Sequence, residues 1–283
     1  MNILLLGGSG QLGFELKREL STLGVVKAPD RDSLDLSDLM AVEQYLQTMR
    51  PDLIVNAAAW TAVDAAENNE ILAQRLNADL PEVLSIYAVN KNVRLVHYSS
   101  DYVYPGNGEI AWTEKSKTSP LNVYGRTKLA GDKAIILSGV DYLIFRTSWV
   151  YSSRGHNFMK TMLKLAETRT EVSVVSDQVG APTPARLLAQ VTMLAIHQNL
   201  EAGIYHLVTH GQISWAGFAQ AIFKHARQNI VVNEIKTDAY PTPAKRPLNS
   251  RLNVNKLEDS LKIKLPDWES QLVLTMNEFL EQP

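Results

Sequence analysis

Residues 2–13 read Asn2-Ile3-Leu4-Leu5-Leu6-Gly7-Gly8-Ser9-Gly10-Gln11-Leu12-Gly13. The four aliphatic residues from Ile3 to Leu6 form an uninterrupted run, which is typical of a strand buried on both faces of a parallel sheet. The glycines end this run. Leucines then recur at helical spacing, at Leu12, Leu16, Leu20 and Leu23. A strand, a glycine-rich turn and a helix in this order predict the start of a βαβ unit.

The same alternation continues outward from this unit. Apolar strand-like runs follow at Val25–Ala28, Leu53–Ala57, Val93–Ser99 and Tyr142–Thr147, with helical patterns between them. They predict an α/β fold built on a doubly wound parallel sheet of the Rossmann type.

Beyond Trp149 the pattern becomes irregular and rich in proline, and we predict a second, smaller α/β substrate domain there. Residues 1–150 would form the dinucleotide-binding domain, completed by about 184–209, because the run Gly203–Val208 is apolar enough to return to the main sheet. Residues 151–183 and 210–283 would form the substrate domain.

Composition narrows the class of protein. The 28 basic and 30 acidic residues nearly cancel, so no broad field favours nucleic acid or an anionic membrane. Cysteine is absent, which excludes disulfides and thiolate chemistry and fits a reducing compartment. No run of about 18 apolar residues occurs. We therefore expect a cytoplasmic protein that binds neither nucleic acid nor membrane.

The glycine loop predicts a dinucleotide site. Glycines between a strand and a helix let the backbone approach a pyrophosphate, whose oxygens then face the N–H groups of the helix N-terminus. We assign cofactor contacts to Gly7, Gly10, Gln11, Leu12 and Gly13.

Four later residues would lie near the adenosine part of the cofactor: Asp30, Arg31, Asp35 and Leu36. An acidic side chain at Asp30 favours NAD by repelling a 2′-phosphate, whereas Arg31 could pair with that phosphate and permit NADP. Arg31 could equally be part of a solvated turn, so the cofactor is either NADPH or NADH. The third predicted strand ends at Ala57, where small side chains would admit the dinucleotide or only allow tight packing. We assign cofactor contacts there to Ala57, Ala58, Ala59, Trp60 and Thr61.

Tyr124 and Lys128 are the candidate catalytic pair. Their spacing places a phenol and an ammonium one turn apart on a helix, where the cation would lower the pKa of the phenol and make it a proton donor. Alone, the pair could be an ordinary surface contact. Ser100 changes this reading, because it stands at the carboxyl end of a predicted sheet strand, where ligands of open α/β sheets bind.

Several blocks resemble the dTDP-4-dehydrorhamnose reductase family of the extended short-chain dehydrogenase/reductase superfamily. Among them are Ser119-Pro120-Leu121-Asn122-Val123-Tyr124-Gly125 and Asp177-Gln178-Val179-Gly180-Ala181-Pro182-Thr183, together with residues 57–64, 97–103, 145–151 and 240–252. The resemblance implies reduction of the C4 ketone of dTDP-4-dehydro-L-rhamnose, a dTDP-linked 4-keto-6-deoxyhexose, by NADPH or NADH.

The resemblance also implies roles for individual residues. Tyr124 would protonate the nascent alkoxide, Ser100 would polarise the carbonyl, and Lys128 would position the cofactor ribose. Tyr98 would lie by the cofactor. Substrate contacts would come from Ser100, Asp101, Tyr102, Trp149, Arg246 and Arg251. Trp149 would pack on thymine and the two arginines on the pyrophosphate, although Trp149 could be a core aromatic and the arginines could lie in a solvated loop.

We expect no metal site. His206 and His210 would lie about 13 Å apart in a strand, too far to share one ion. Arg186 stands where some family members have an acidic residue that helps to bind a bridging metal, so a metal-linked dimer is in doubt and a homodimer of another kind stays open. We expect Glu15, Glu278 and Glu281 to be surface carboxylates.

Other functions use the same scaffold. A sugar dehydratase needs a second acid after Asp101, where Tyr102 stands instead. A nucleotide-sugar epimerase, or another reductase of the superfamily, would share the triad of Ser100, Tyr124 and Lys128. A non-catalytic dinucleotide-binding regulatory subunit is the alternative from outside the enzymes, and the complete triad argues against it.

Overall fold

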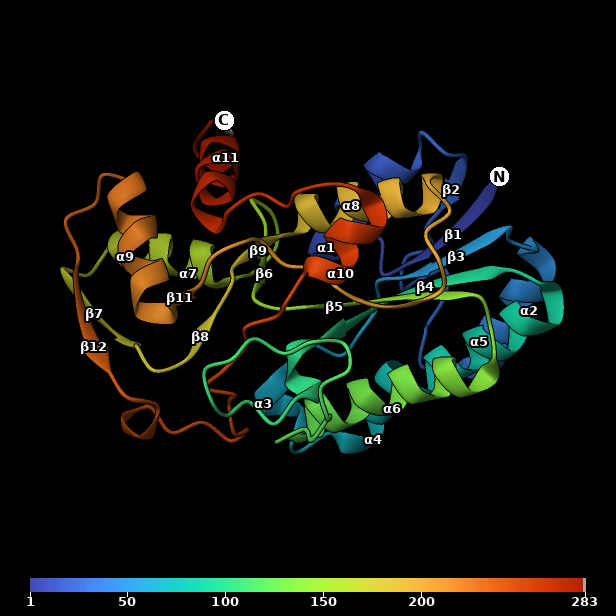
Figure 1. The fold of residues 1–283 in the computed structure, drawn as a ribbon, viewed down its shortest axis with the longest axis horizontal. Coiled ribbons are helices and arrows are strands. Elements are labelled where there is room, and N and C mark those ends of the chain that lie inside the picture. The colour runs from blue at the N-terminus through green and yellow to red at the C-terminus, as the bar shows by residue number, and fades with distance from the viewer. Residues whose placement is uncertain (282–283) are drawn as a thin grey trace.

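The computed structural model describes residues 1–281, and its centre is a six-stranded parallel sheet (Figure 1). The strand order is β2-β1-β3-β4-β5-β10. The strands are β1 (Asn2–Leu6), β2 (Val25–Lys27), β3 (Leu53–Asn56), β4 (Arg94–Ser100), β5 (Tyr142–Thr147) and β10 (Gly203–His206). The first five lie within one residue of their predicted bounds. β10 pairs in parallel with β5, so the predicted return of the chain to the main sheet is confirmed.

Helices cover both faces of this sheet (Figure 1). One face carries α1 (Gln11–Leu20), α8 (Ala185–His197) and α10 (Asn255–Leu261); the other carries α2 (Leu39–Met49), α5 (Leu80–Lys91) and α6 (Val123–Ser138). In β1, Ile3 and Leu5 belong to the first core and Leu4 and Leu6 to the second. The run is uninterrupted because successive side chains point to opposite buried faces. The predicted doubly wound sheet is confirmed.

The order in which successive strands are added to the sheet changes direction at β1. β2 adds to one side of β1 and β3 to the other, and the later strands follow β3. In open α/β sheets, ligands bind outside the carboxyl ends of the strands at such a switch point. Three short segments run close to this edge: α3 (Val63–Ala66), α4 (Glu70–Gln74) and the π-helical turn Arg75–Asp79 that leads into α5.

A third hydrophobic core lies beside the sheet, at the left of Figure 1. It is built from α7 (Phe158–Ala166), β7 (Glu171–Val175), α9 (Trp215–His225), β12 (Val231–Ile235) and α11 (Trp268–Leu280). Two short ladders are separate from the six-stranded sheet: β6 (Val150–Tyr151) with β9 (Thr183–Pro184), and β8 (Val179–Gly180) with β11 (Ile213–Ser214). Residues 252–265, including α10, instead pack on the first core.

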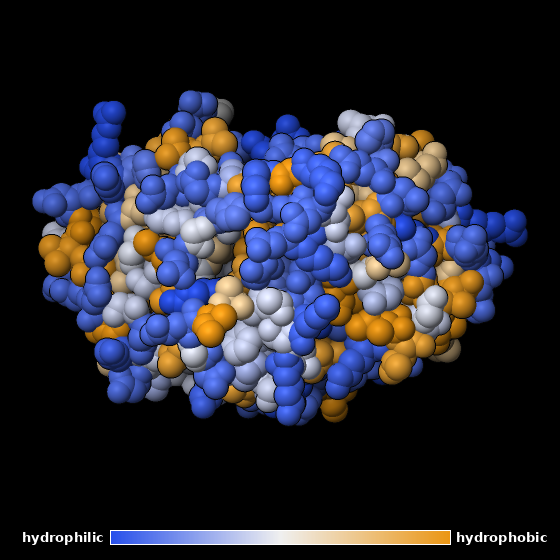
Figure 2. Space-filling model, in the orientation of Figure 1, coloured by the Kyte–Doolittle hydropathy of each residue, from blue (hydrophilic) through white to orange (hydrophobic). Residues whose placement is uncertain are grey.

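The surface seen in Figure 2 is mostly hydrophilic, with apolar residues in several separate patches. Within residues 1–281 no helix has the length and apolar character needed to span a bilayer.

Arg186 at the start of α8 joins three helices. Its guanidinium bonds Glu15 of α1 at 3.4 Å and Glu278 of α11 at 2.8 Å. Glu15 is only 2% exposed, so the expectation that it is a surface carboxylate was wrong: the helical face that carries it packs against α8. Arg186 supplies the positive charge between the two carboxylates.

Replacing Arg186 by alanine should lower the free energy of unfolding by about 1–3 kcal/mol, because Glu15 would be left buried without its partner. Urea denaturation would measure the loss. Arg75→Ala, which removes an exposed pair with Asp79, should change stability by less than about 0.5 kcal/mol. Equal effects of the two substitutions would contradict this role of Arg186.

Candidate functional site

A cavity of about 780 Å³ opens at the carboxyl ends of β1, β3 and β4. Every residue for which the sequence predicted a cofactor contact lines it: Gly7, Gly10, Gln11, Leu12, Gly13, Asp30, Arg31, Asp35, Leu36, Ala57, Ala58, Ala59, Trp60, Thr61, Tyr98, Tyr124 and Lys128. Ser100, Asp101, Tyr102 and Trp149 also line it, whereas Arg246 and Arg251 do not. The structure thus brings six separate predicted segments to one place: residues 7–13, 30–36, 57–61 and 98–102, the pair Tyr124 and Lys128, and Trp149.

The glycine loop leaves no room for side chains. Gly7 has a φ of 79°, and a Cβ on Gly7 would lie 2.7 Å from the main chain of Ala57. A Cβ on Gly13 would lie 2.0 Å from the carbonyl oxygen of Gly7. Gly10 begins α1 without a side-chain cap, so the first N–H groups of α1 have no side-chain acceptor. Such a helix N-terminus suits a pyrophosphate.

The acidic residues on the rim are ionised. Asp30 Oδ1 accepts hydrogen bonds from Ser33 Oγ at 2.6 Å and from Ser33 N at 2.9 Å, which lower the pKa of its carboxyl. Bonds from Ser37 lower the pKa of Asp35, and the charge of Arg31 adds to this. A carboxylate and a guanidinium therefore share the end of the cavity where the adenosine was expected.

Asn77 fixes the loop after β3, and no sequence pattern indicated this role. Its Oδ1 accepts from Trp60 N at 2.9 Å, and its Nδ2 donates to Trp60 O at 3.1 Å and to Thr127 Oγ1 at 3.1 Å. Asn77 lies in the π-helical turn, a rare irregularity that often marks functional sites. Gly131 lets α6 approach this turn, since a Cβ there would lie 2.1 Å from Asn77 O.

The candidate catalytic residues converge from β4 and α6. Ser100 ends β4, and its Oγ donates to Asp101 Oδ1 at 3.0 Å and accepts from Tyr102 N at 3.2 Å, which caps the 3₁₀ turn Asp101–Val103. Asn122 caps α6 by accepting from Gly125 N at 2.8 Å. Gly125 allows the close packing of the two segments, because a Cβ there would lie 2.3 Å from Tyr102 O.

Lys128 is a buried member of this cluster. It is 1% exposed, and its Nζ donates to Tyr98 O at 2.6 Å. Burial lowers the pKa of Lys128 to about 8, although the charge of Asp132 opposes this. Tyr98 therefore serves the site through its carbonyl, while its hydroxyl bonds Thr192 Oγ1 of α8 at 2.7 Å.

The pKa of Tyr124 differs from our expectation. The sequence predicted a lowered value from Lys128, but burial raises the pKa of Tyr124 to about 12, opposed by a hydrogen bond with Ser100. Asp101 and Asp132 raise it further. Helical spacing places Lys128 near the phenol but does not fix the surroundings of the phenol, and burial has the largest effect on the pKa of Tyr124.

Trp149 is stacked on Trp215, the first residue of α9. The ring centroids are 3.6 Å apart and the planes differ by 11°. Trp149 has a φ of 50°, rare for a large side chain, so the surrounding fold holds it in place. The sequence did not predict Trp215 as a pocket residue, because it reads as an ordinary start of an amphipathic helix.

Arg246 and Arg251 do not line the cavity, and both are held by protein partners. Arg246 Nη2 pairs with Asp64 Oδ2 at 2.6 Å, and the Arg246 charge lowers the pKa of Tyr102 against the larger effect of burial. Arg251 bonds Gln212 and Asn249.

The two histidines that could suggest a metal have separate partners. His206 Nε2 lies 2.7 Å from Tyr104 Oη, and His210 Nε2 lies 2.7 Å from Glu258 Oε1. Across residues 1–281, no three His, Asp or Glu side chains are placed to hold one metal ion.

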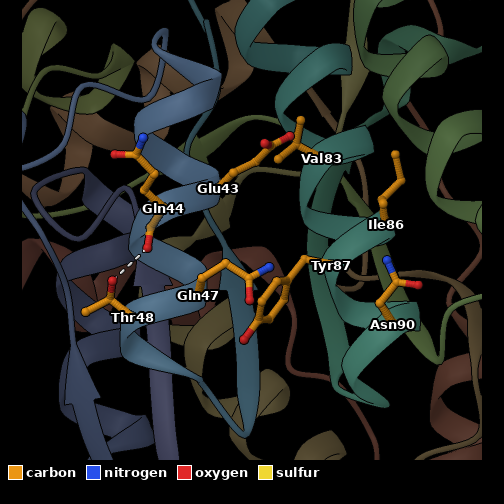
Figure 3. Close-up of a pocket in the computed structure, with 8 residues that line it drawn as sticks. All are labelled: Glu43, Gln44, Gln47, Thr48, Val83, Ile86, Tyr87 and Asn90. Carbon is orange, nitrogen blue, oxygen red and sulfur yellow. Dashed lines mark hydrogen bonds between the residues drawn. The ribbon is translucent and has the colours of Figure 1, made fainter.

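A second cavity, of about 700 Å³, lies between α2 and α5 (Figure 3). Its lining is mainly amide and aliphatic: Glu43, Gln44, Gln47 and Thr48 come from α2, and Val83, Ile86, Tyr87 and Asn90 come from α5. It shares no residue with the first cavity. We therefore place the chemistry in the first cavity.

The sheet, the glycine loop and the convergence of Ser100, Tyr124 and Lys128 define the class of extended short-chain dehydrogenases/reductases. The RmlD substrate binding domain family matches residues 1–281, and the chain belongs to this family. The resemblance seen in the sequence is thereby confirmed.

Named relatives agree with this assignment. A dTDP-4-dehydrorhamnose reductase of Salmonella typhimurium is 49% identical over 95% of both chains, and one of Escherichia coli is 47% identical over 98% of both. A solved dTDP-4-dehydrorhamnose reductase of Clostridium acetobutylicum has a TM-score of 0.95 at 34% identity, over 99% of this chain and 100% of that one. Another, from Bacillus anthracis in complex with NADP, has a TM-score of 0.94 at 34% identity, over 98% of this chain and 99% of that one.

Asp101 should make stability depend on pH. Burial raises its pKa from the usual 3.8 to about 6, against hydrogen bonds with Ser250 and Ser100. Because the folded-state value is the higher one, this stabilising effect is complete below about pH 4 and is lost as the pH rises through about 6. Asp101→Asn keeps the shape and removes the charge.

Relative to the Asp101→Asn variant, the unsubstituted protein should thus lose up to about 3 kcal/mol of unfolding free energy between pH 4 and pH 7. Urea denaturation at several pH values would measure the difference, with the exposed Asp32→Asn as the matched control. A difference that does not change with pH would refute a raised pKa at Asp101.

Proposed function

We propose that this chain is a dTDP-4-dehydrorhamnose reductase that uses NADPH or NADH to reduce the C4 ketone of dTDP-4-dehydro-L-rhamnose, giving dTDP-L-rhamnose. The single observation that carries this proposal is the meeting of Ser100, Tyr124 and Lys128 in the cavity that the glycine loop also lines. The identity to named reductases over nearly the whole chain supports the choice of substrate.

The cavity fits a dinucleotide. The uncapped N-terminus of α1 suits the pyrophosphate, and the absence of Cβ atoms at Gly7 and Gly13 keeps the main chain close. Ser99 Oγ and Thr147 Oγ1 line the cavity, buried and without hydrogen-bond partners among residues 1–281, so polar ligand atoms could satisfy them. When bound, the reduced nicotinamide supplies the hydride. Bound NADP in the Bacillus anthracis relative supports NADPH, and Arg31 is the residue that would meet its 2′-phosphate.

The residues of this chain handle the proton. Ser100 would donate a hydrogen bond to the substrate carbonyl, and Tyr124 would give its phenolic proton to the alkoxide oxygen at C4. Lys128, one turn further along α6, would hold the ribose hydroxyls and stabilise the phenolate. Asp101 and Tyr102 would contact the sugar. Arg246 and Arg251 would meet the pyrophosphate of the sugar nucleotide only after exchanging Asp64 and Gln212 as partners.

We propose that two parts of the chain bind different ligands. Residues 1–150, with about 184–209, would bind the dinucleotide, and residues 151–183 and 210–283 would bind the nucleotide sugar. The separate core of α7, α9 and α11 supports this, whereas the packing of residues 252–265 on the sheet ties the second part to the first. The availability of reduced dinucleotide supports a cytoplasmic location, and the near balance of charge supports a small-molecule partner.

The decisive assay follows NADPH or NADH oxidation with dTDP-4-dehydro-L-rhamnose generated in situ, and identifies the product. Stoichiometric oxidation with formation of dTDP-L-rhamnose is the expected result. An epimerase would act without consuming added reductant, and a regulatory subunit would give neither product. Either outcome would overturn the proposed reaction.

Tyr124→Phe should reduce turnover by about 10²–10⁴ while leaving the affinity for NADPH nearly unchanged, because only the proton donor is lost. Steady-state kinetics and a separate binding titration would measure the two effects. Tyr142→Phe, which alters a tyrosine at the far end of β5, should leave turnover unchanged. Turnover that survives in Tyr124→Phe would exclude Tyr124 as the acid.

Binding of dTDP should disturb the Trp149–Trp215 stack if thymine packs on Trp149, since Trp215 occupies a face of that ring. The excitonic signal of the stacked indoles in circular dichroism should weaken on addition of dTDP and be absent in Trp215→Phe. Trp112→Phe, in which the pair is intact, is the control. A signal unchanged at saturating dTDP would place the base away from that face of Trp149.

A further inference from the structure

A chain of buried polar groups lies behind Lys128, and the proposed mechanism does not use it. Asn56 ends β3 and His97 lies in β4; they are 1% and 0% exposed. Asn56 Nδ2 is 3.2 Å from His97 Nδ1, and His97 Nε2 is 3.3 Å from Lys128 Nζ. Buried polar groups are costly unless their hydrogen bonds match. The pattern of donors along this chain therefore constrains each member.

The direction of hydrogen bonding along these buried groups is set at Asn56. Ala58 N donates to Asn56 Oδ1 at 3.2 Å, so the amide presents its NH₂ group to His97. Nδ1 of His97 must then be the acceptor. Burial is the largest cause that holds the pKa of His97 well below its usual value, so the ring is neutral and carries its single proton on Nε2. That N–H points at Lys128 Nζ.

An ammonium at Lys128 would conflict with this arrangement. It has donors only, so its protons would face the N–H of His97, whereas a neutral amine has a lone pair that can accept it. The bond from Lys128 Nζ to Tyr98 O is compatible with either form. We propose that the hydrogen bonds running from Ala58 N through Asn56 and His97 favour the neutral amine of Lys128 over its ammonium, which makes Asn56 and His97 positioning residues for the charge of Lys128.

The other groups around Lys128 do not reverse this preference. Asp132, one turn further along α6, favours the charged form, but its Oδ2 is paired with Arg146 of β5 at 2.9 Å. Tyr124, one turn earlier on α6, is neutral because its own pKa is raised. Burial acts on Lys128 in the same sense as the hydrogen-bond chain.

The consequence for catalysis rests on the proposed function. After Tyr124 gives up its proton, a Lys128 ammonium stabilises the phenolate and a neutral amine does so less. Reduction should therefore slow as the pH rises and Lys128 loses its proton. A change that favours the ammonium should move this decline to higher pH.

Asn56→Asp tests the direction of hydrogen bonding from Asn56 through His97 to Lys128. A carboxylate accepts from both Ala58 N and His97 Nδ1, which moves the imidazole proton to Nδ1 and turns the Nε2 lone pair toward Lys128. In protein labelled with [ε-¹³C]lysine, the Lys128 signal can be assigned by its loss in Lys128→Arg and titrated by NMR without any ligand. We expect the titration midpoint to rise by more than about one pH unit in Asn56→Asp.

The double variant Asn56→Asp/His97→Phe separates the chain from a simple charge effect, because it keeps the carboxylate and removes the imidazole. Its rise should be less than half of that in Asn56→Asp. His97→Gln gives a second test with an uncharged side chain, whose amide oxygen can face the ammonium, and should also raise the midpoint. The exposed His225→Phe is the control and should leave it unchanged.

An equal rise in the single and double Asn56 variants would overturn the proposal, as would an unchanged midpoint in both Asn56→Asp and His97→Gln. These measurements contain no substrate. Failure of the reductase assay would thus overturn the proposed reaction without affecting the result for Lys128. An unchanged Lys128 titration would overturn the inference about its charge without affecting the proposed reaction.

Discussion

The contact between main chains at the switch point of the sheet is the constraint on which the site depends. Gly7, Gly13 and the carbonyl of Ala57 come so close that no side chain fits between them. This contact brings the start of α1 to the end of β3 and leaves a cleft rather than a packed core at that edge. Because β1 lies between β2 and β3, it also fixes where the cleft opens.

A second set of close approaches positions the catalytic side. Gly125 and Gly131 let α6 lie against the turn after β4 and against the π-helical turn that holds Asn77. Tyr124 and Lys128 lie on this helix, so their placement relative to Ser100 follows from the absence of two Cβ atoms. Buried hydrogen bonds then orient the side chains: Asn122 caps the helix, Tyr98 O accepts from Lys128, and Asn77 fixes the loop at Trp60.

The fold and most of the cavity could be predicted because they follow from local patterns. Uninterrupted apolar runs identified the parallel strands, and the position of the glycine loop between a strand and a helix identified the cofactor end. Asn56, Asn77, His97 and Trp215 could not be found this way. Each occupies a position where its residue type is unremarkable in sequence, and only its partners from distant segments give it a place in the site.

The sequence by itself determined the succession of strands and helices along the chain, the location of the glycine loop and most of the residues that line the cavity, because these depend on periodicity and backbone conformation over a few residues. The tertiary structure decided their electrostatic state. Burial raises the pKa of Tyr124 and lowers that of Lys128, and the packing of α1 against α8 buries Glu15. These effects depend on how much water the packed segments exclude. Such exclusion is a property of contacts far apart in the chain, which no local pattern records.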